Sequence, residues 1–457
     1  MFIDRYDEMR CLEEQYQRDS ASFVVIYGRR RVGKTTCISE FIKDKKSIYM
    51  LATEESDEMN QRLFKQSVEE AMNMNIEFTG WEELFKSIPF STEERIVVVL
   101  DEFQYLGKVK ASFPSILQRI WDTYLMNQNV MLILCGSLVS MMESQALNYS
   151  SPLYGRRTAQ MKMKQIPYRY YKDFYPDMEE YQRLKHYAVT GGIPKYIELF
   201  GHKEDVFDTI QETVLNPNGF LYEEPMFLLK NEVAETGSYF SILSAIASGN
   251  RKISQMASVL QMPQSQLLKY LYTLMELDLI ERQVPVTELN PERSKKGIYR
   301  IKDHFISFWF RFVYPYRSRL EIHQAEAVLD KIRRDFPSSH LGYVYEDICR
   351  ERLLMMCSTS KLNAELNLVG RWWDNDDHEI DLVGLDNENK IMVAAECKCW
   401  IHQAGINILE KLEEKAEHVQ WKNTERTVKY VLFSVCGFTE ELKMLAQKRN
   451  DVILIEG

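Results

Sequence analysis

With 457 residues, of which 45% are hydrophobic and 27% charged, the chain has the balance of an ordinary globular protein, and extensive disorder is excluded. Its 57 Lys and Arg against 67 Asp and Glu give a net charge of −10, so the chain is not a protein that coats nucleic acid in bulk, although a local basic patch stays open. No apolar run approaches a membrane span, and the charged N-terminus lacks a signal-peptide core, so we expect no membrane partner.

The length predicts roughly two to four domains. Of the eight cysteines, only Cys397 and Cys399 lie close together, which is typical of reduced thiols in the cytoplasm rather than of a disulfide framework. No second His or Cys pair lies near them in the sequence, so we interpret both as buried thiols and not as zinc ligands.

The first part of the chain alternates apolar strands with helical patterns. The expected strands are residues 22–27, 46–51, 95–101 and 129–136, and the expected helices are 35–43, 57–72 and 113–127. Strands that are apolar on both faces and are separated by helices indicate a parallel sheet covered on both sides. Residues 160–235 are predicted to be mostly helical, with a turn at 191–194.

The segment GRRRVGKT (28–35) fits the phosphate-binding loop G-x-x-x-x-G-K-[ST], with a strand before it and a helix after it. The glycines let backbone N–H groups and the helix N-terminus meet the phosphates. Lys34 is expected to reach the β- and γ-phosphates of ATP, and the Thr35 hydroxyl to bind Mg²⁺. The residues predicted to hold the nucleotide are Gly28, Arg29, Arg30, Arg31, Val32, Gly33, Lys34, Thr35 and Thr36.

Two acids end the apolar strand that finishes at residue 101. Asp101 is expected to hold Mg²⁺, and Glu102 to polarise the attacking water. Buried strands seldom finish with paired carboxylates unless a cation or a proton transfer requires them. The alternative is that the pair only caps the next helix.

Residues 236–320 change in character. Three helical patterns and two strand patterns that flank a polar loop predict a winged helix-turn-helix. The predicted recognition helix, residues 264–276, carries a single basic residue, Lys269. The side chains expected to read bases are Gln264, Ser265 and Gln266. The wing carries Arg293, Lys295, Lys296 and Arg300, which could grip a DNA backbone. Alternatively, the winged helix packs against the rest of the protein and does not bind DNA.

The aromatic run 303–316 is predicted to be a packed helix.

From about residue 330 a second α/β pattern begins. Asp381 and Glu396 fall on adjacent predicted strands, and Glu396 and Lys398 share one strand face. The two carboxylates are expected to hold Mg²⁺ or Mn²⁺, with Glu346 from the preceding helix as a further ligand, while Lys398 activates water. This D-x(14)-E-x-K arrangement resembles the core of the PD-(D/E)xK nucleases. The alternative is a sheet edge with solvated charges.

Several segments resemble the archaeal-type AAA-related P-loop ATPases near the STAND group. They are GRRRVGKT (28–35), LDEFQYL (100–106), CGS (135–137), SPLYGRR (151–157), TGGIPKYIELF (190–200) and FISFWFRFVYP (305–315). The resemblance implies that Ser137 senses the γ-phosphate and that Arg156 contacts it, either within one chain or from a neighbouring subunit of a homo-oligomer. Arg156 and Arg157 could instead pair with surface acids. Asp4 and Arg5 are further candidates to touch the nucleotide.

The predicted fold class is therefore α/β: a P-loop NTPase parallel sheet with a helical lid, a winged helix-turn-helix, and a C-terminal restriction-endonuclease-like α/β domain. The expected domains are the ATPase core 1–160, the lid 161–235, the winged helix with the aromatic helix 236–320, and the nuclease-like domain 330–457. We expect an ATP-binding, Mg²⁺-dependent ATPase that regulates a metal-dependent nuclease acting on DNA or other nucleic acid. The alternative is an ATP-dependent switch or a DNA-binding regulator whose C-terminal domain is non-catalytic.

Overall fold

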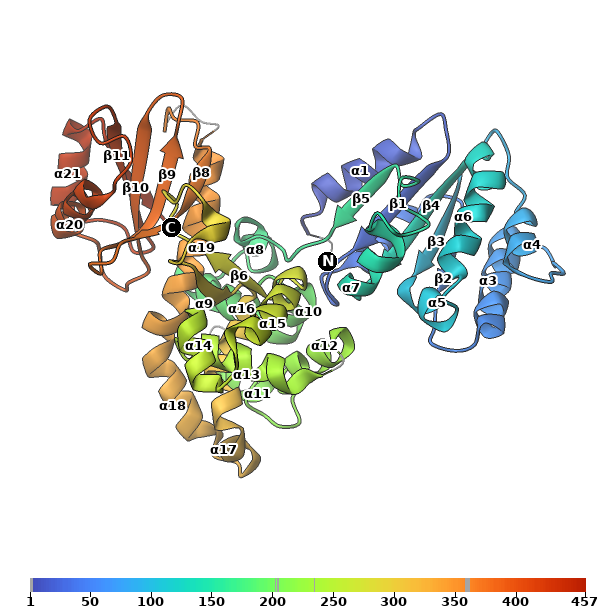
Figure 1. The fold of residues 1–457 in the computed structure, drawn as a ribbon, viewed down its shortest axis with the longest axis horizontal. Helices are drawn as coiled ribbons and strands as arrows, with labels where there is room; N and C mark the ends of the chain where they lie inside the picture. The colour runs from blue at the N-terminus through green and yellow to red at the C-terminus, as the bar shows by residue number, and fades with distance from the viewer. Residues whose placement is uncertain (1–2, 202, 204, 234, 358–361) are drawn as a thin grey trace. The chain divides into compact units, whose positions relative to one another are not determined.

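A computed structural model describes residues 3–201, 203, 205–233, 235–357 and 362–457. The chain divides into two compact units, and each contains a five-stranded sheet (Figure 1). The first unit comprises the chain up to Tyr170 and two later segments, Gly192–Glu198 and one that begins at Leu228. The second comprises the rest. Within the described ranges, no helix combines the length and apolarity needed to cross a membrane.

The sheet of the first unit is parallel throughout, with the strand order β2-β3-β4-β1-β5. Its strands are β1 (Ser22–Tyr27), β2 (Ser47–Leu51), β3 (Ile96–Asp101), β4 (Val130–Gly136) and β5 (Ala159–Lys162). Every residue of β1, β3 and β4 is buried, because helices cover both faces of the sheet (Figure 1). The predicted α/β fold with a buried parallel sheet is confirmed.

The helices of this unit alternate with its strands. They are α1 (Tyr6–Tyr16), α2 (Lys34–Ile42), α3 (Asp57–Met72), α4 (Trp81–Lys86), α5 (Gln104–Val109), α6 (Phe113–Thr123), η1 (Leu125–Asn127), α7 (Val139–Met142), η2 (Glu143–Leu147) and η3 (Tyr168–Tyr170). The stretch that the sequence predicts to be mostly helical, residues 160–235, begins instead with a strand, since Ala159–Lys162 form β5 beside β1. This four-residue edge strand lacks an apolar run, and only its backbone pairing with β1 gives it a strand conformation.

Short helices connect the two sheets along the chain. They are α8 (Tyr171–Phe174), α9 (Glu180–Thr190), α10 (Pro194–Phe200), α11 (Val206–Thr213) and α12 (Glu224–Glu232). The predicted turn after α9 is present, and Gly191 and Gly192 both have positive φ angles, of 61° and 71°. A side chain on Gly192 would meet the backbone oxygen of Ile166 at 2.1 Å, so glycine is required there.

Three helices and a two-stranded antiparallel sheet follow, in the order that the sequence indicates. They are α13 (Thr236–Ala247), α14 (Ile253–Leu260), α15 (Gln264–Glu276), β6 (Ile280–Gln283) and β7 (Ile298–Ile301), with η4 (Pro291–Arg293) between the strands. Gln264, Ser265 and Gln266 are exposed, as are Arg293, Lys295 and Lys296. The expectation that Arg300 is a free wing charge was wrong.

Arg300 is only 8% exposed and forms an ion pair with Asp347, donating from Nη1 to Oδ1 at 2.9 Å. His304 Nε2 lies 3.1 Å from the other oxygen of Asp347. The pKa of Asp347 is lowered, because the pairing with Arg300 and His304 outweighs burial, which alone would raise it. Arg300 therefore joins β7 to the helix that carries Asp347.

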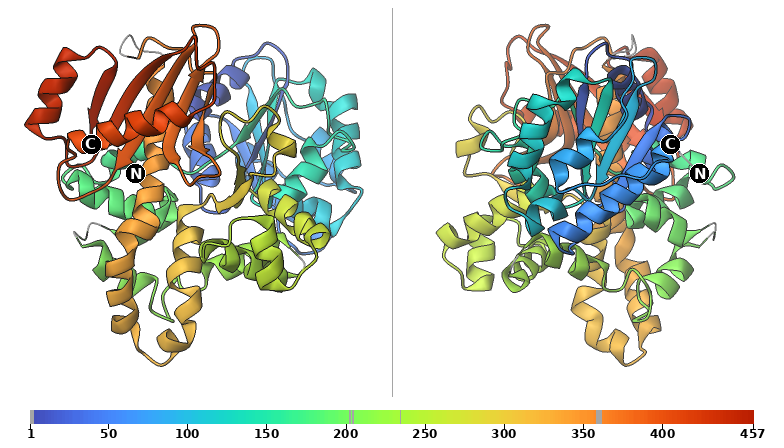
Figure 2. Two further views of the ribbon diagram at one scale, coloured as in Figure 1. Left: turned by 60° about the vertical axis from the view of Figure 1, so that its left-hand side comes forward. Right: turned by 90° about the vertical axis from the view of Figure 1, so that its right-hand side faces the viewer.

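The aromatic run forms the packed helix α16 (His304–Phe312), whose Trp309 is fully buried and donates from Nε1 to the Tyr222 carbonyl at 2.7 Å. After η5 (Tyr314–Tyr316) and α17 (Arg317–Glu321), a long helix rises to the C-terminal sheet (Figure 2). It consists of α18 (Ala325–Phe336), the π-helical turn η6 (Pro337–Leu341) and α19 (Gly342–Met356).

The C-terminal sheet has the order β12-β11-β10-β9-β8. Its elements are β8 (Leu368–Trp373), β9 (Glu379–Asp386), β10 (Ile391–Lys398), α20 (Ile406–His418), β11 (Thr427–Ser434), α21 (Glu440–Lys448) and β12 (Val452–Glu456). β8, β9 and β10 are antiparallel neighbours, whereas β10, β11 and β12 are parallel. The core beneath α20 contains Met392 and Ala394 of β10 together with Ile408 and Leu412 of the helix. β8 is the edge strand of this sheet. The backbone N–H of Val286 donates a hydrogen bond to the Arg371 carbonyl of β8, with an N–O distance of 3.0 Å.

Candidate nucleotide and metal sites

The loop between β1 and α2 forms a closed turn around one ammonium group. Gly28, Arg31 and Gly33 have positive φ angles, which let the backbone turn sharply before α2 begins at Lys34. Lys34 is 6% exposed, and its Nζ donates to the carbonyls of Gly28 and Arg29 at 2.8 and 2.9 Å. Burial lowers the pKa of Lys34. A buried ammonium at a helix N-terminus fits a polyphosphate.

The end of β3 lies beside this loop. The Thr35 hydroxyl donates to Asp101 Oδ2 at 2.9 Å, and the Tyr49 hydroxyl donates to the same oxygen at 2.5 Å. Asp101 is only 1% exposed. A hydroxyl and a carboxylate that already touch are a donor set that suits Mg²⁺, which prefers hard oxygen ligands. The structure thus brings the two predicted magnesium ligands together.

Glu102 is held in an unusual backbone conformation, with φ of 51°. Its carboxylate oxygen Oε2 accepts a hydrogen bond from Ser137 Oγ at 2.7 Å and another from Gln104 Nε2. Ser137, at the end of β4, is 2% exposed. The two residues predicted to act on the γ-phosphate and its attacking water are therefore in direct contact with each other.

The C-terminal acids meet where two strands separate. The pairing of β9 with β10 ends at Leu382 and Ala395, and the next residues along are Asp381 and Glu396. Beyond this point Asp381 Oδ2 accepts a hydrogen bond from the Cys397 N–H at 2.8 Å. Burial raises the pKa of Asp381, and the nearby Glu396 carboxylate raises it further. Two carboxylates that repel each other at a strand fork can be neutralised by a cation.

Lysines reach Glu396 from two elements. Lys398 Nζ lies 2.7 Å from Glu396 Oε1, and Lys415 of α20 lies 3.4 Å from both carboxylate oxygens. Burial lowers the pKa of Lys398, but the neighbouring Glu396 outweighs it, and the pKa is raised. Lys398 is therefore protonated and positioned beside the acids.

Glu346 approaches Asp381 from α19. Burial raises the pKa of Glu346 to about 7, although Arg371 opposes this, with its Nη1 2.9 Å from Glu346 Oε2. The electrostatic influence of Asp381 adds to the upward shift. Asp381, Glu396 and Lys398 thus meet at the strand fork, with Lys415 beside Glu396, while Glu346 pairs with Arg371 and acts on Asp381 through its charge.

Known proteins resemble the chain in both parts. Residues 2–200 match a family described as an ATPase domain predominantly from Archaea. An uncharacterized protein of Methanocaldococcus jannaschii is 35% identical over 400 residues, which cover 87% of this chain and 87% of that protein. The chain belongs to this archaeal-type ATPase family. Residues 309–416 of the ATPase match a second family, described as archaeal and bacterial proteins of unknown function.

Two further proteins resemble the ATPase over part of its length. An uncharacterized ATP-binding protein of M. jannaschii is 44% identical over 46 residues, which are 10% of this chain and 78% of that protein. The Walker-type ATPase of Pyrococcus abyssi is 21% identical, with a TM-score of 0.52 over 68% of this chain and 96% of its own. This likeness shows the P-loop NTPase fold.

Arg156 of the ATPase forms a bidentate ion pair in the structure. Its Nε and Nη2 each donate to Asp122 at 2.8 Å, and its Nη1 donates to the Pro152 carbonyl at 2.8 Å. Arg157 Nη1 donates to the Leu147 carbonyl at 3.2 Å. The pairing with a surface acid, which the sequence left open, is thus present for Arg156.

Several site residues of the ATPase had no sequence signal. Tyr49 and Gln104 fix the two acids at the end of β3, and Lys415 lies 19 residues beyond Glu396. Arg5, which the sequence offered as a nucleotide contact, is 4% exposed and donates from Nη2 to the Val32 and Lys164 carbonyls at 2.7 and 2.8 Å. Its guanidinium therefore holds the phosphate-binding loop in place through the Val32 carbonyl.

The first testable consequence concerns Gly28. A Cβ there would lie 2.4 Å from the Met163 carbonyl oxygen, and φ of 148° is strained for any side chain. We expect Gly28→Ala to lower the free energy of unfolding by about 2 kcal/mol or more. Chemical denaturation checks this, with Gly80→Ala as the control, since nothing lies within 4 Å of a Cβ at Gly80. Equal stability of the two variants would contradict the close approach of the Met163 backbone to Gly28.

Proposed function

We propose that this protein is a Mg²⁺-dependent ATPase that controls an appended metal-dependent nuclease acting on nucleic acid. The observation that carries the nuclease half is the fork of β9 and β10, which sets Asp381, Glu396 and Lys398 around one point. Family membership supports the ATPase half. The experiment that tests both halves compares cleavage and ATP hydrolysis in single-residue variants, as described in the Discussion.

In the ATPase site each side chain has a distinct role. Lys34 would hold the β- and γ-phosphates, while Thr35 and Asp101 would hold Mg²⁺, which neutralises phosphate charge when bound. Glu102 would orient the attacking water, and Ser137, which touches Glu102, would link that carboxylate to the γ-phosphate. The backbone amides from Gly28 to Thr36 complete the cradle.

Arg156 is the proposed arginine contact to the γ-phosphate. Its side chain is 27% exposed and its partner Asp122 is 39% exposed, so solvent weakens this ion pair and exchange for a phosphate costs little. An arginine that reaches the transition state contributes about 10³–10⁵-fold in rate. We propose that it acts on a neighbouring subunit of a homo-oligomer.

A mixing experiment tests this assignment. Arg156→Ala should lose ATP hydrolysis by about 10³-fold, and activity should return when it is mixed with the inactive Lys34→Ala protein. In mixed oligomers one subunit then supplies an intact loop and its neighbour an intact arginine. Phosphate release measures the rescue, and Asp122→Ala is the control, because it removes only the partner of Arg156. Absence of rescue in verified mixed oligomers would assign Arg156 to its own chain or to structure.

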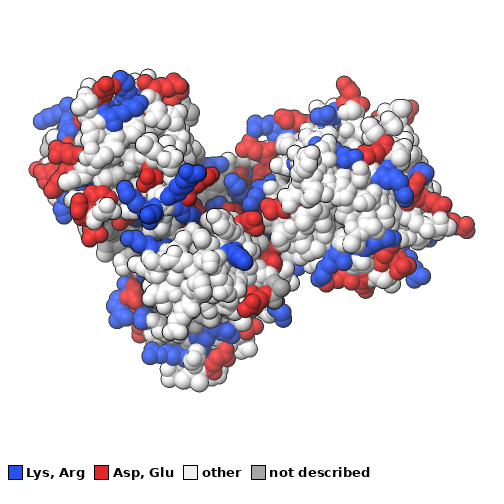
Figure 3. All heavy atoms as spheres, viewed as in Figure 1, with Lys and Arg blue, Asp and Glu red and all other residues white. Residues whose placement is uncertain are grey.

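In the nuclease-like site, Asp381, Glu396 and Glu346 would hold Mg²⁺ or Mn²⁺, and the Lys398 ammonium would orient the attacking water beside the scissile phosphate. On the face drawn in Figure 3, Lys and Arg side chains gather at the end of the C-terminal sheet where β10 ends. Positive charge around acidic metal ligands favours a phosphodiester substrate.

The winged-helix assignment for α13–α15, β6 and β7 belongs to the same proposal. The exposed wing residues Arg293 and Lys295 would contact a DNA backbone, and the exposed polar start of α15 would meet bases. Without Arg300 the wing retains three basic residues, one of which, Lys296, lies 3.9 Å from Glu288. Such a surface supports weak binding, so the module assists rather than dominates DNA contact.

A second function is favoured by one observation. Glu396 already has two ammonium partners, Lys398 and Lys415, so its charge can be satisfied without a metal ion. In that case the C-terminal domain would bind a partner or nucleic acid without cutting it, and the protein would be an ATP-dependent switch. Divalent-metal binding at Asp381 distinguishes the two functions.

A further inference from the structure

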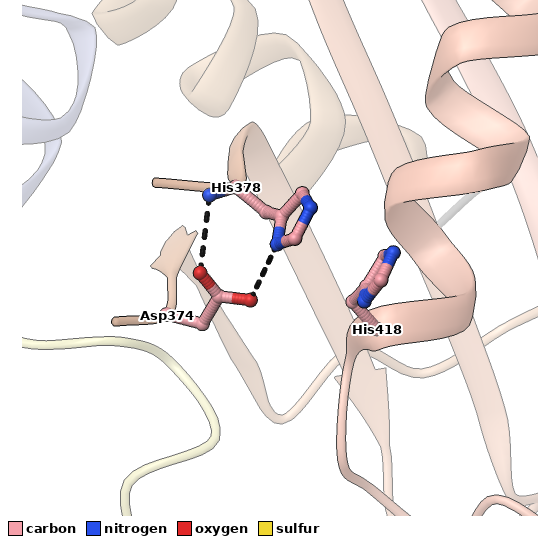
Figure 4. Close-up of side chains that lie close together, drawn as sticks. All are labelled: Asp374, His378 and His418. Carbon is pink, nitrogen blue, oxygen red and sulfur yellow. Dashed lines mark hydrogen bonds and ion pairs between the residues drawn. The ribbon is translucent and has the colours of Figure 1, made fainter. Parts of the chain in front are cut away.

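Three chemistry-bearing side chains gather on the C-terminal domain away from the strand fork. Asp374 follows β8, His378 precedes β9, and His418 is the last residue of α20 (Figure 4). One potential ligand atom from each lies within 4.8 Å of the others. Neither the ATPase site nor the proposed nuclease site uses any of the three.

Asp374 orders the turn that carries His378. Its Oδ1 accepts hydrogen bonds from the backbone N–H groups of Asp376 and His378 at 2.8 and 3.0 Å. Its Oδ2 lies 2.8 Å from His378 Nδ1. The carboxylate and the imidazole are therefore held in place before any ligand arrives, which reduces the entropic cost of binding.

His418 completes the group from another element. Its ring stacks on that of His378, with centroids 4.0 Å apart and planes 14° from parallel. The side chain is exposed, and its ring nitrogens have no hydrogen-bond partner among the residues that the structure describes. A cation at this place would also face the C-terminal end of the 13-residue helix α20, where the helix dipole is negative.

We propose that Asp374, His378 and His418 bind a divalent transition-metal ion, with Zn²⁺ as the representative. The ion takes the place of the hydrogen between Asp374 Oδ2 and His378 Nδ1, and the neutral His378 ring then carries its one proton on Nε2. His418 supplies the third ligand after its exposed ring rotates, because nitrogen lone pairs of parallel rings do not converge. Water fills the fourth position.

The ligand chemistry selects the ion. Two imidazoles and one carboxylate suit Zn²⁺, Ni²⁺ or Co²⁺, whereas Mg²⁺ prefers oxygen ligands such as those of Asp381 and Glu396. Ligand atoms of a tetrahedral zinc site lie roughly 3.3 Å apart. The three ligand atoms now lie within 4.8 Å of one another, and rotation of the exposed His418 side chain would bring them closer. The bound ion would fasten the β8–β9 turn to the end of α20.

Titration of the full, chelator-treated chain with Zn²⁺ and Co²⁺ tests the proposal. We expect wild type to bind one more ion than His418→Ala or Asp374→Asn, and to show a visible Co²⁺ absorption band that both variants lack. Asn at 374 keeps an oxygen for the two backbone N–H groups, so the turn survives. His402→Ala is the control, since this exposed residue of the same domain stacks on Trp400 instead.

The readouts separate this site from the others. Zinc should raise the unfolding temperature of wild type and of His402→Ala, but not that of His418→Ala. Asp381→Ala should retain the extra zinc ion, because its side chain is no part of the cluster. Equal ion counts, equal affinity and identical Co²⁺ spectra in wild type, His418→Ala and Asp374→Asn would overturn the proposal.

Discussion

Glu102→Gln is expected to bind ATP as tightly as wild type but to hydrolyse it at least about 100-fold more slowly, because an amide cannot accept a proton from the attacking water. The substitution keeps the size of the side chain and an oxygen for the contact from Ser137. Calorimetric ATP titration and phosphate release measure the two quantities separately. Unchanged hydrolysis would show that a different residue positions the water.

Lys34→Ala should behave differently and lose ATP binding itself. It removes a buried ammonium that the loop carbonyls of Gly28 and Arg29 hold in place. Lys65→Ala is the matched control, since Lys65 forms an ion pair with Glu69 on the partly exposed face of α3. Tight ATP binding by Lys34→Ala would contradict the assignment of the loop.

Asp381→Ala is expected to abolish divalent-metal binding at the C-terminal site and to reduce any nucleic-acid cleavage by at least about 10³-fold. Its removal leaves Glu396 without the carboxylate from the adjacent strand, β9. ATP hydrolysis should stay nearly unchanged, because Asp381 lies in the other structural unit. Mg²⁺ and Mn²⁺ titration, together with plasmid and single-strand cleavage with ATP, ADP or no nucleotide, measures these effects.

Lys398→Ala distinguishes catalysis from metal binding at the same site. It should leave metal affinity nearly intact but depress cleavage, because its ammonium acts on water and phosphate rather than on the ion. Lys390→Ala, which removes the same charge from the exposed loop between β9 and β10, is the charge-matched control. A wild-type protein that neither binds divalent metal at these residues nor cuts nucleic acid would favour the ATP-dependent switch.

Much of the nucleotide site follows from local sequence. The phosphate-binding loop is encoded within eight residues, and the strands around it are apolar on both faces, so pattern and spacing predict them. β5 was missed because a four-residue edge strand depends on backbone pairing with β1, more than 130 residues earlier in the chain. The φ of 51° at Glu102 and its contact with Ser137 are likewise products of tertiary packing.

At the C-terminal site, too, some residues could be predicted from the sequence and others depend on tertiary packing. Asp381, Glu396 and Lys398 were found because strand periodicity sets which residues share a face. Lys415 and Arg371 were not, since each comes from a separate element whose position only the folded sheet determines. Arg300 looked like a wing charge in the sequence, but pairing with Asp347 of α19 buries it.

That buried ion pair constrains how the protein can be divided for experiments. A fragment that ends before α19 would deprive the Arg300 guanidinium of both the Asp347 carboxylate and the Tyr343 carbonyl, to which it donates hydrogen bonds. A fragment that starts after β7 would expose Asp347 and, with the loss of Val286, the outer edge of β8. Expression of the last 130 or so residues alone is therefore expected to give an aggregating product, and a boundary ahead of α13 retains both contacts.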